Sequence, residues 1–219
     1  YRVGLTATPK RKDGLETWMA LALGPTVYRI DQETLDRAGR TMAPEIVVLN
    51  TGHEVAVGEH PAATMRGVLE DRQRDAHVQR AVRRLVADGR RVLVLTSLVD
   101  HAESFAEAVG GSALVGRCTT RKRQEVLEAV RAGSLSVVVA TQLADEGLDL
   151  PELDAVVLAA PSSHKPATRQ RVGRACRALE GKRTPIVVDV VDAGQWAARK
   201  WSARRALYRS LGWTIRREA

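Results

Sequence analysis

Five short apolar runs, spaced along the chain from about residue 45, are the feature that most constrains its fold. They are rich in β-branched residues and nearly all apolar, which is typical of parallel strands covered on both faces. The runs occupy 46–49, 92–95, 137–140, 155–158 and 186–190. Stretches with helical periodicity and capping residues separate them, over about 71–88, 99–109 and 120–132. Since strands that alternate with such helices form βαβ units, the sequence predicts a doubly wound, parallel α/β domain.

The ends of the chain lie outside this alternation and predict the domain organisation. The N-terminal segment holds a strand end, a loop and an apolar helix-like stretch (15–23), and it begins without an initiating Met. We therefore expect residues 1–44 to be the end of a preceding domain plus a connector, and 45–192 to be the α/β domain. Residues 193–219 are expected to form a basic, aromatic helix packed on that domain. The stretch 51–67, which contains glycines and a proline, has no assignment.

Charge and composition limit the class of partner. The net charge is +8 and the isoelectric point is near 10.1, which favours a polyanionic partner such as nucleic acid. Cys118 and Cys176, the only cysteines, exclude a disulfide framework. The five histidines lack metal-ligand spacing, so we interpret them as surface or core side chains and predict no metal site. With no apolar run of about 18 residues and no secretory signal, we expect a cytoplasmic protein without a membrane partner.

The aromatic residues of the C-terminal segment allow two interpretations. Trp196, Trp201, Tyr208 and Trp213 are interleaved with arginines. Aromatic rings among cations suit stacking on unpaired bases. Their spacing also suits an amphipathic helix that docks on the sheet, and the periodicity favours this second interpretation.

Three other segments carry residues suited to phosphate chemistry. The segment 140–151, A-T-Q-L-A-D-E-G-L-D-L-P, follows a buried strand and so lies at the carboxyl edge of the sheet, where ligands of open α/β sheets bind. The segment 170–177, Q-R-V-G-R-A-C-R, predicts a helix on which Arg174 and Arg177 share one face with Gln170. The segment 4–9, G-L-T-A-T-P, places small hydroxyl residues at a strand end.

Taken in chain order (4–9, 140–151, 170–177), these three segments resemble motifs of superfamily 2 nucleic-acid helicases. They correspond to the Thr-Ala-Thr motif that closes the first motor domain, then to A-T-x-x-x-x-x-G-(I/L)-D-(I/L)-P and Q-x-x-G-R-x-x-R of the second. The resemblance covers most of the chain and is greatest to phage-encoded and repair-type DNA helicases. It implies a RecA-like fold for the α/β domain. It also implies two partners: nucleic acid, with DNA favoured over RNA, and a preceding RecA-like domain of the same protein.

The resemblance also assigns roles to individual residues. Arg174 and Arg177 become candidate arginine fingers, which neutralise the charge that develops on a γ-phosphate, and Gln170 would orient the attacking water or that phosphate. Two weaker matches place Ser97 and Gly116 at strand-to-helix turns that contact a nucleic-acid backbone. The remaining assignments are nucleic-acid contact for Thr141, nucleotide contact for Gly147 and Asp149, and interdomain coupling for Thr6 and Thr8.

The ATP-binding loop G-x-x-x-x-G-K-(S/T) and the Mg²⁺-binding D-E-x-(D/H) box of the family do not occur in this sequence. Both belong to the first motor domain, which would therefore bind ATP and Mg²⁺ for the full-length parent. We expect the parent to be an ATP-dependent helicase and residues 1–219 alone to lack ATPase activity. Two alternatives stay open. The chain could be a non-catalytic binding module derived from a helicase, or the motor part of a restriction or remodelling complex.

Overall fold

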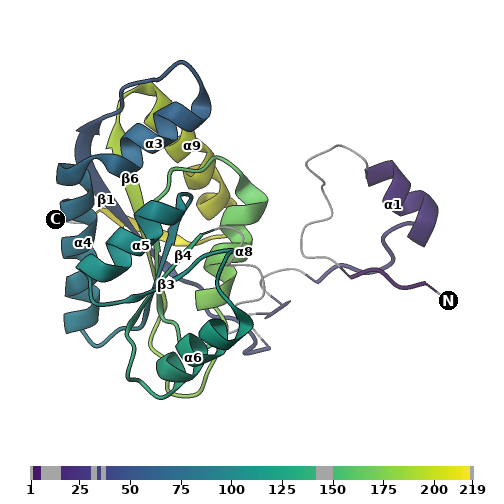
Figure 1. The fold of residues 1–219 in the computed structure, drawn as a ribbon. Helices are drawn as coiled ribbons and strands as arrows, with labels where there is room; N and C mark the ends of the chain where they lie inside the picture. Colours follow the sequence, from purple (N-terminus) through teal and green to yellow (C-terminus); the bar gives the residue numbers. More distant parts are fainter. Residues whose placement is uncertain (1, 6–15, 31–33, 36–37, 142–149, 218–219) are drawn as a thin grey trace.

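The strands form one parallel sheet, as the sequence predicts. The computed structural model describes residues 2–5, 16–30, 34–35, 38–141 and 150–217. Figure 1 shows the sheet with its surrounding helices. Within the described residues, seven strands pair in the order β3-β4-β2-β5-β6-β1-β7. Their bounds are β1 Glu45–Glu54, β2 Val92–Thr96, β3 Ser112–Leu114, β4 Val137–Thr141, β5 Ala155–Leu158, β6 Ile186–Ala193 and β7 Thr214–Arg217.

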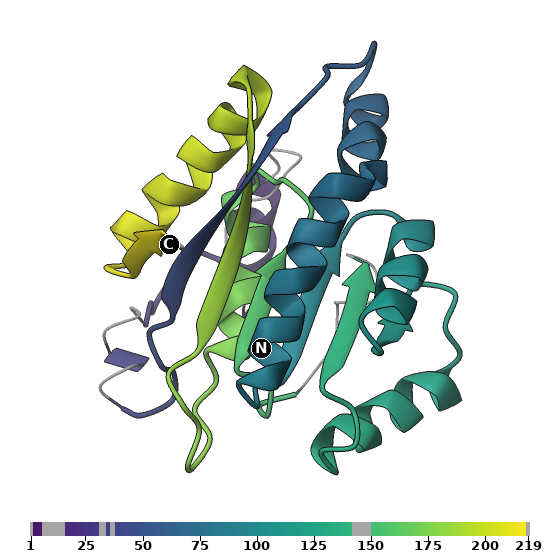
Figure 2. The same cartoon turned by 90° about the vertical axis from the view of Figure 1, so that its left-hand side faces the viewer.

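Helices cover both faces of this sheet (Figure 2). One face packs against α4 (Arg72–Ala87) and α5 (Val99–Ala108). The other packs against α6 (Thr120–Arg131), α8 (Lys165–Ala175) and α9 (Gln195–Ser210). All five residues of β2 are buried, and its four apolar residues alternate between the two cores, as expected of a strand with helices above and below it. The doubly wound α/β prediction is confirmed.

Three elements of the domain were not predicted. The unassigned stretch 51–67 contains the end of β1 and the start of α3 (Pro61–Glu70), in which Pro61 occupies the first helical turn. Strand β3 has only three residues, too few for a visible pattern. Strand β7 reads Thr-Ile-Arg-Arg and is exposed at the sheet edge, where pairing with β1 stabilises it although its composition is polar.

The C-terminal aromatics mostly pack inside the domain. Tyr208 is fully buried, Trp213 is 7% exposed, and their stacked rings lie 5.8 Å apart between centroids. The ring centroids of Trp201 and Tyr208, both on α9, lie 6.3 Å apart. Trp196 is only partly buried and carries the Lys200 ammonium 4.4 Å from its ring centroid. These contacts support docking of the helix over base stacking for three of the four rings.

Helix α1 (Glu16–Leu23) lies apart from the sheet (Figure 1) and belongs to the N-terminal arm, by which we mean the described residues 2–5 and 16–30. The arm exposes large apolar side chains, among them Trp18 at 67%, Leu21 at 73% and Tyr28 at 75%. None of the helices in the described ranges is both long enough and apolar enough to cross a lipid bilayer.

Alkaline pH is expected to weaken the fold through Tyr208. Burial, and then the nearby Asp189 carboxylate, raise the pKa of the Tyr208 phenol well above its usual 10. The folded state therefore keeps a proton that the unfolded chain releases, so the stabilisation is complete below about pH 10 and is lost as pH rises through the folded pKa. Urea unfolding of the wild type and Tyr208→Phe between pH 8 and 11.5 should show a shallower alkaline loss in the variant. Parallel pH profiles would contradict this.

Candidate nucleic-acid and nucleotide interface

Three predicted nucleic-acid contacts lie at neighbouring strand ends. Thr141 ends β4, and Ser97 directly follows β2, the adjacent strand. Gly116 lies in the turn after β3, on the other side of β4. Because all three strands are parallel, the structure brings these residues to one edge of the sheet. This is the carboxyl edge, at which open α/β sheets bind ligands.

The Ser97 side chain has an unsatisfied hydroxyl. Its Oγ is shielded from solvent and has no hydrogen-bond partner in the part of the chain that the structure describes, although the residue as a whole is only partly buried. Buried polar atoms without partners are rare because they lose hydration without compensation. Hydroxyl side chains donate to phosphate oxygens of nucleic-acid backbones, and Ser97 Oγ would do so once a local movement opened it to the outside. The orphaned atom therefore fits the predicted role.

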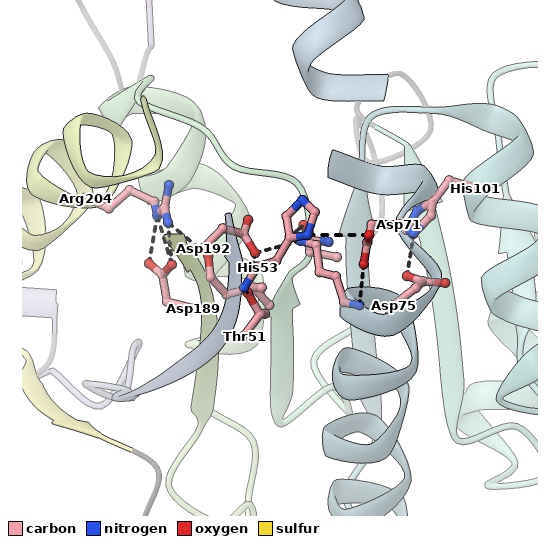
Figure 3. A network of polar contacts seen from close by, with 11 residues as sticks. Thr51, His53, Asp71, Asp75, His101, Asp189, Asp192 and Arg204 are labelled. Carbon is pink, nitrogen blue, oxygen red and sulfur yellow. Dashed lines mark hydrogen bonds and ion pairs between the residues drawn. The ribbon is translucent and has the colours of Figure 1, made fainter. Parts of the chain in front are cut away.

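A buried histidine links helix α4 to the end of β2, and Figure 3 shows its ring beside Asp75. The His101 ring is bonded through Nδ1 to Thr96 Oγ1 at 2.7 Å and through Nε2 to Asp75 Oδ1 at 2.8 Å. Thr96 pairs in register with Thr141 and precedes Ser97, so this chain of bonds joins α4 and α5 to the predicted contact edge. Of the two open interpretations of the histidines, the core one holds for His101, which is 6% exposed. The sequence signal was its helical spacing from Phe105, four residues later on the buried face of α5.

The predicted arginine helix ends earlier than expected. Helix α8 stops at Ala175 with Cys176 as its C-cap, so Arg177 lies beyond it, and the prediction that Arg174 and Arg177 share one helical face is wrong. Cys176 itself is buried in the core, 2% exposed. Gln170 is exposed on α8, and Arg177 is exposed after it. The side chain of Arg174 lies outside the described part of the structure.

The connector pairs with the segment that carries Arg177. Thr41 and Arg177 form an antiparallel bridge. It is flanked by Met42 N donating to Cys176 O at 2.8 Å and Ala178 N donating to Arg40 O at 3.3 Å. The backbone at Arg177 is thus fixed by the connector.

Lys182 links two of the predicted motifs, a contact that the sequence did not reveal. Its Nζ donates to Pro151 O at 2.8 Å and to Arg177 O at 2.9 Å. Burial lowers the pKa of this lysine, and nearby acidic groups partly oppose the shift. The end of the 140–151 segment and Arg177 are therefore held by one ammonium group. In the sequence Lys182 is one of several cations in a basic stretch, and its spacing from the two motifs does not predict a contact with either.

Four predicted site residues fall outside the described residues. They are the nucleotide contacts Gly147 and Asp149 and the interdomain residues Thr6 and Thr8. Their roles stay predictions.

A family model described as "Helicase conserved C-terminal domain" matches residues 62–179 of the chain. The curated relatives include the probable helicase D10 of Escherichia phage T5, which is 27% identical over 221 residues, covering 97% of this chain and 48% of the phage protein. They also include the DNA 3'-5' helicase XPB of Kineococcus radiotolerans, 27% identical over 80% of this chain and 32% of that protein. The chain spans half or less of the length of these relatives.

Solved structures share the fold. T4 UvsW superposes with a TM-score of 0.64 at 14% identity, over 80% of this chain and 41% of that one. S. cerevisiae Dbp5 bound to RNA and ADP BeF3 gives 0.61 at 13% identity, over 96% of this chain and 50% of that one. At such low identity the likeness concerns the fold alone, and it confirms the predicted RecA-like architecture.

Proposed function

The chain belongs to the helicase conserved C-terminal domain family of superfamily 2, and we propose that it serves as the second motor domain of an ATP-dependent helicase or translocase. In this proposal the full-length parent hydrolyses ATP to move along or unwind nucleic acid. This domain holds one strand and delivers arginines to ATP that the preceding domain binds.

The observation that carries the proposal is the shared edge at the ends of β3, β4 and β2. Ser97 and Thr141 lie there on adjacent strands, and the Ser97 hydroxyl has no internal partner. A second motor domain needs such donors for a backbone phosphate. The net charge of +8 adds the long-range attraction that nucleic acid requires.

Arg177 and Arg174 are the proposed arginine fingers. Bound ATP with Mg²⁺, held mainly by the preceding domain, supplies the phosphoryl group. Arg177 is an exposed residue just beyond α8, and the connector bridge and Lys182 fix its backbone, which suits a residue that must reach across an interdomain cleft. Gly147 and Asp149 are proposed to contact the nucleotide from this side, and Gln170 to orient the attacking water or the γ-phosphate.

The preceding RecA-like domain is the proposed protein partner. The exposed Trp18, Leu21 and Tyr28 of the N-terminal arm give it an apolar surface to cover. Thr6 and Thr8 would couple the two domains. We propose DNA over RNA as the nucleic acid, because relatives of this chain are named DNA helicases.

Nucleic-acid binding by residues 1–219 tests the contact edge. We expect weak binding to single-stranded DNA whose affinity falls steeply with salt, since phosphate contacts release counterions. Ser97→Ala should raise the Kd roughly tenfold, which corresponds to about 1.4 kcal/mol for a lost bond to a charged group. Ser202→Ala, on the exposed face of α9, is the matched control and should bind like the wild type. Salt-independent affinity, or equal Kd values for both variants, would remove the support for this edge.

A further inference from the structure

Two carboxylates on β6 form buried ion pairs on opposite faces of the sheet (Figure 3). Asp189 is fully buried and pairs with Arg204 of α9, which donates from Nη2 to Oδ1 at 2.6 Å and from Nε to Oδ2 at 2.8 Å. Asp192 is 6% exposed and accepts at Oδ1 from Arg74 Nε of α4 at 2.8 Å. Helices α9 and α4 belong to different cores, so the two pairs lie above and below the same strand.

Each of these arginines has a further nitrogen bonded to the loop between β5 and α8. Arg204 Nη1 donates to Ser162 O at 2.7 Å, and Arg74 Nη2 donates to Ala159 O at 2.7 Å. The two carbonyls are three residues apart, and the arginines reach them from opposite sides of the sheet. The planar guanidinium lets each arginine hold a carboxylate with one set of donors and direct another donor at a carbonyl in a fixed direction.

The clamped loop leads directly into α8, which carries Arg174 and ends before Arg177. Ser162 Oγ accepts from His164 N at 3.2 Å, and His164 caps α8 by accepting from Ala167 N at 3.2 Å. The position of Ser162 therefore determines where the first turn of α8 begins. Gln170 and Arg174 follow on that helix, and Arg177 comes directly after it.

We propose that Arg74 and Arg204 are positioning residues that fix the β5–α8 loop to β6 and so set the placement of the arginine segment toward ATP. This inference deepens the proposed function and rests on it. Neither arginine reaches the site itself, since both are buried at 2% exposure. They act through the two loop carbonyls, and a small displacement of a reacting group is enough to slow a phosphoryl transfer.

Arginine-to-lysine variants of the full-length parent test the clamp. In Arg204→Lys one ammonium keeps the charge beside Asp189 but lacks the fork that also holds Ser162 O. We expect the kcat of nucleic-acid-stimulated ATP hydrolysis to fall about ten- to a hundredfold, with the KM for ATP and the Kd for nucleic acid nearly unchanged. Arg74→Lys should act in the same way through Ala159.

Each variant has a matched control in the same buried cluster. Tyr208→Phe removes the 2.6 Å bond from Tyr208 Oη to Asp189, and Thr51→Val removes the 2.6 Å bond from Thr51 Oγ1 to Asp192. Neither Tyr208 nor Thr51 is bonded to the loop by its side chain in the described residues, so kcat should stay within about twofold of wild type even if the melting temperature falls. A lysine variant that matches its control in kcat would overturn the clamp. Should one lysine variant fail to fold, the other decides.

Hydrogen exchange tests the clamp without hydrolysis. In wild-type residues 1–219, the amide of Thr168 in the first turn of α8 should be protected as strongly as amides of β6, because the clamp joins them into one unit. Fast exchange at Thr168 beside slow exchange in β6 would overturn the proposal. Protected exchange together with unchanged hydrolysis in Arg177→Ala would instead place the failure with the proposed function.

Discussion

Arg177→Ala in the full-length parent is expected to lower nucleic-acid-stimulated ATP hydrolysis by about 10³- to 10⁵-fold while ATP binding stays nearly intact. The reason is that a finger acts on charge that develops only in the transition state, so its loss appears in kcat and not in the affinity for ATP. Steady-state hydrolysis with saturating DNA, together with equilibrium binding of a fluorescent ATP analogue, separates the two quantities.

The control is a second exposed arginine. Arg205→Ala removes the same charge from the solvent-facing side of α9 and should leave turnover unchanged. Arg174→Ala completes the comparison, because 174 and 177 are the two proposed fingers. Full turnover in Arg177→Ala would refute its assignment, and a loss confined to Arg174→Ala would leave a single finger on the helix.

The central strands could be predicted because burial on both faces leaves a continuous apolar run. One of the two cores buries each residue from Val92 to Leu95, so this strand can be recognised from its own sequence without knowing which strands pair with it. Strand β7 had no such signal. It owes its place to hydrogen bonds with β1, and its two arginines remain in solvent. Tertiary pairing of this kind cannot be read from local composition.

The same limit applies to the candidate site. The strands before Ser97 and Thr141 mark the edge on which they lie, so their placement together could be predicted. The end of α8 could not be predicted. The helical pattern of the sequence continues through Arg177, whereas in the fold the backbone of Arg177 pairs with Thr41 of the distant connector. The role of Lys182 could not be predicted either, because the carbonyl oxygens of Pro151 and Arg177 that it binds come together only in the folded chain.

Asp189→Asn is expected to destabilise the α/β domain strongly. Asp189 is fully buried, accepts from both Arg204 and Tyr208, and is nearly isosteric with the asparagine that replaces it. Breaking such a pair leaves an uncompensated buried guanidinium and costs about 3–5 kcal/mol. At about 2–4 °C per kcal/mol for a chain of this size, the unfolding midpoint should fall by roughly 6–20 °C. Calorimetry of residues 1–219 measures this shift.

An exposed ion pair with the same shortest N–O distance shows whether burial or distance decides the cost. Arg117 Nη2 and Glu103 Oε1 also lie 2.6 Å apart, but their side chains are 66% and 43% exposed. Water already solvates both charges, so Glu103→Gln should leave the unfolding midpoint within experimental error. A double variant, Asp189→Asn with Arg204→Met, should recover part of the lost stability, because it removes the stranded charge along with its partner. If the unfolding midpoint of Asp189→Asn were no lower than that of Glu103→Gln, the two carboxylates would contribute equally to stability. Strand β6 could then not anchor the loop that precedes α8.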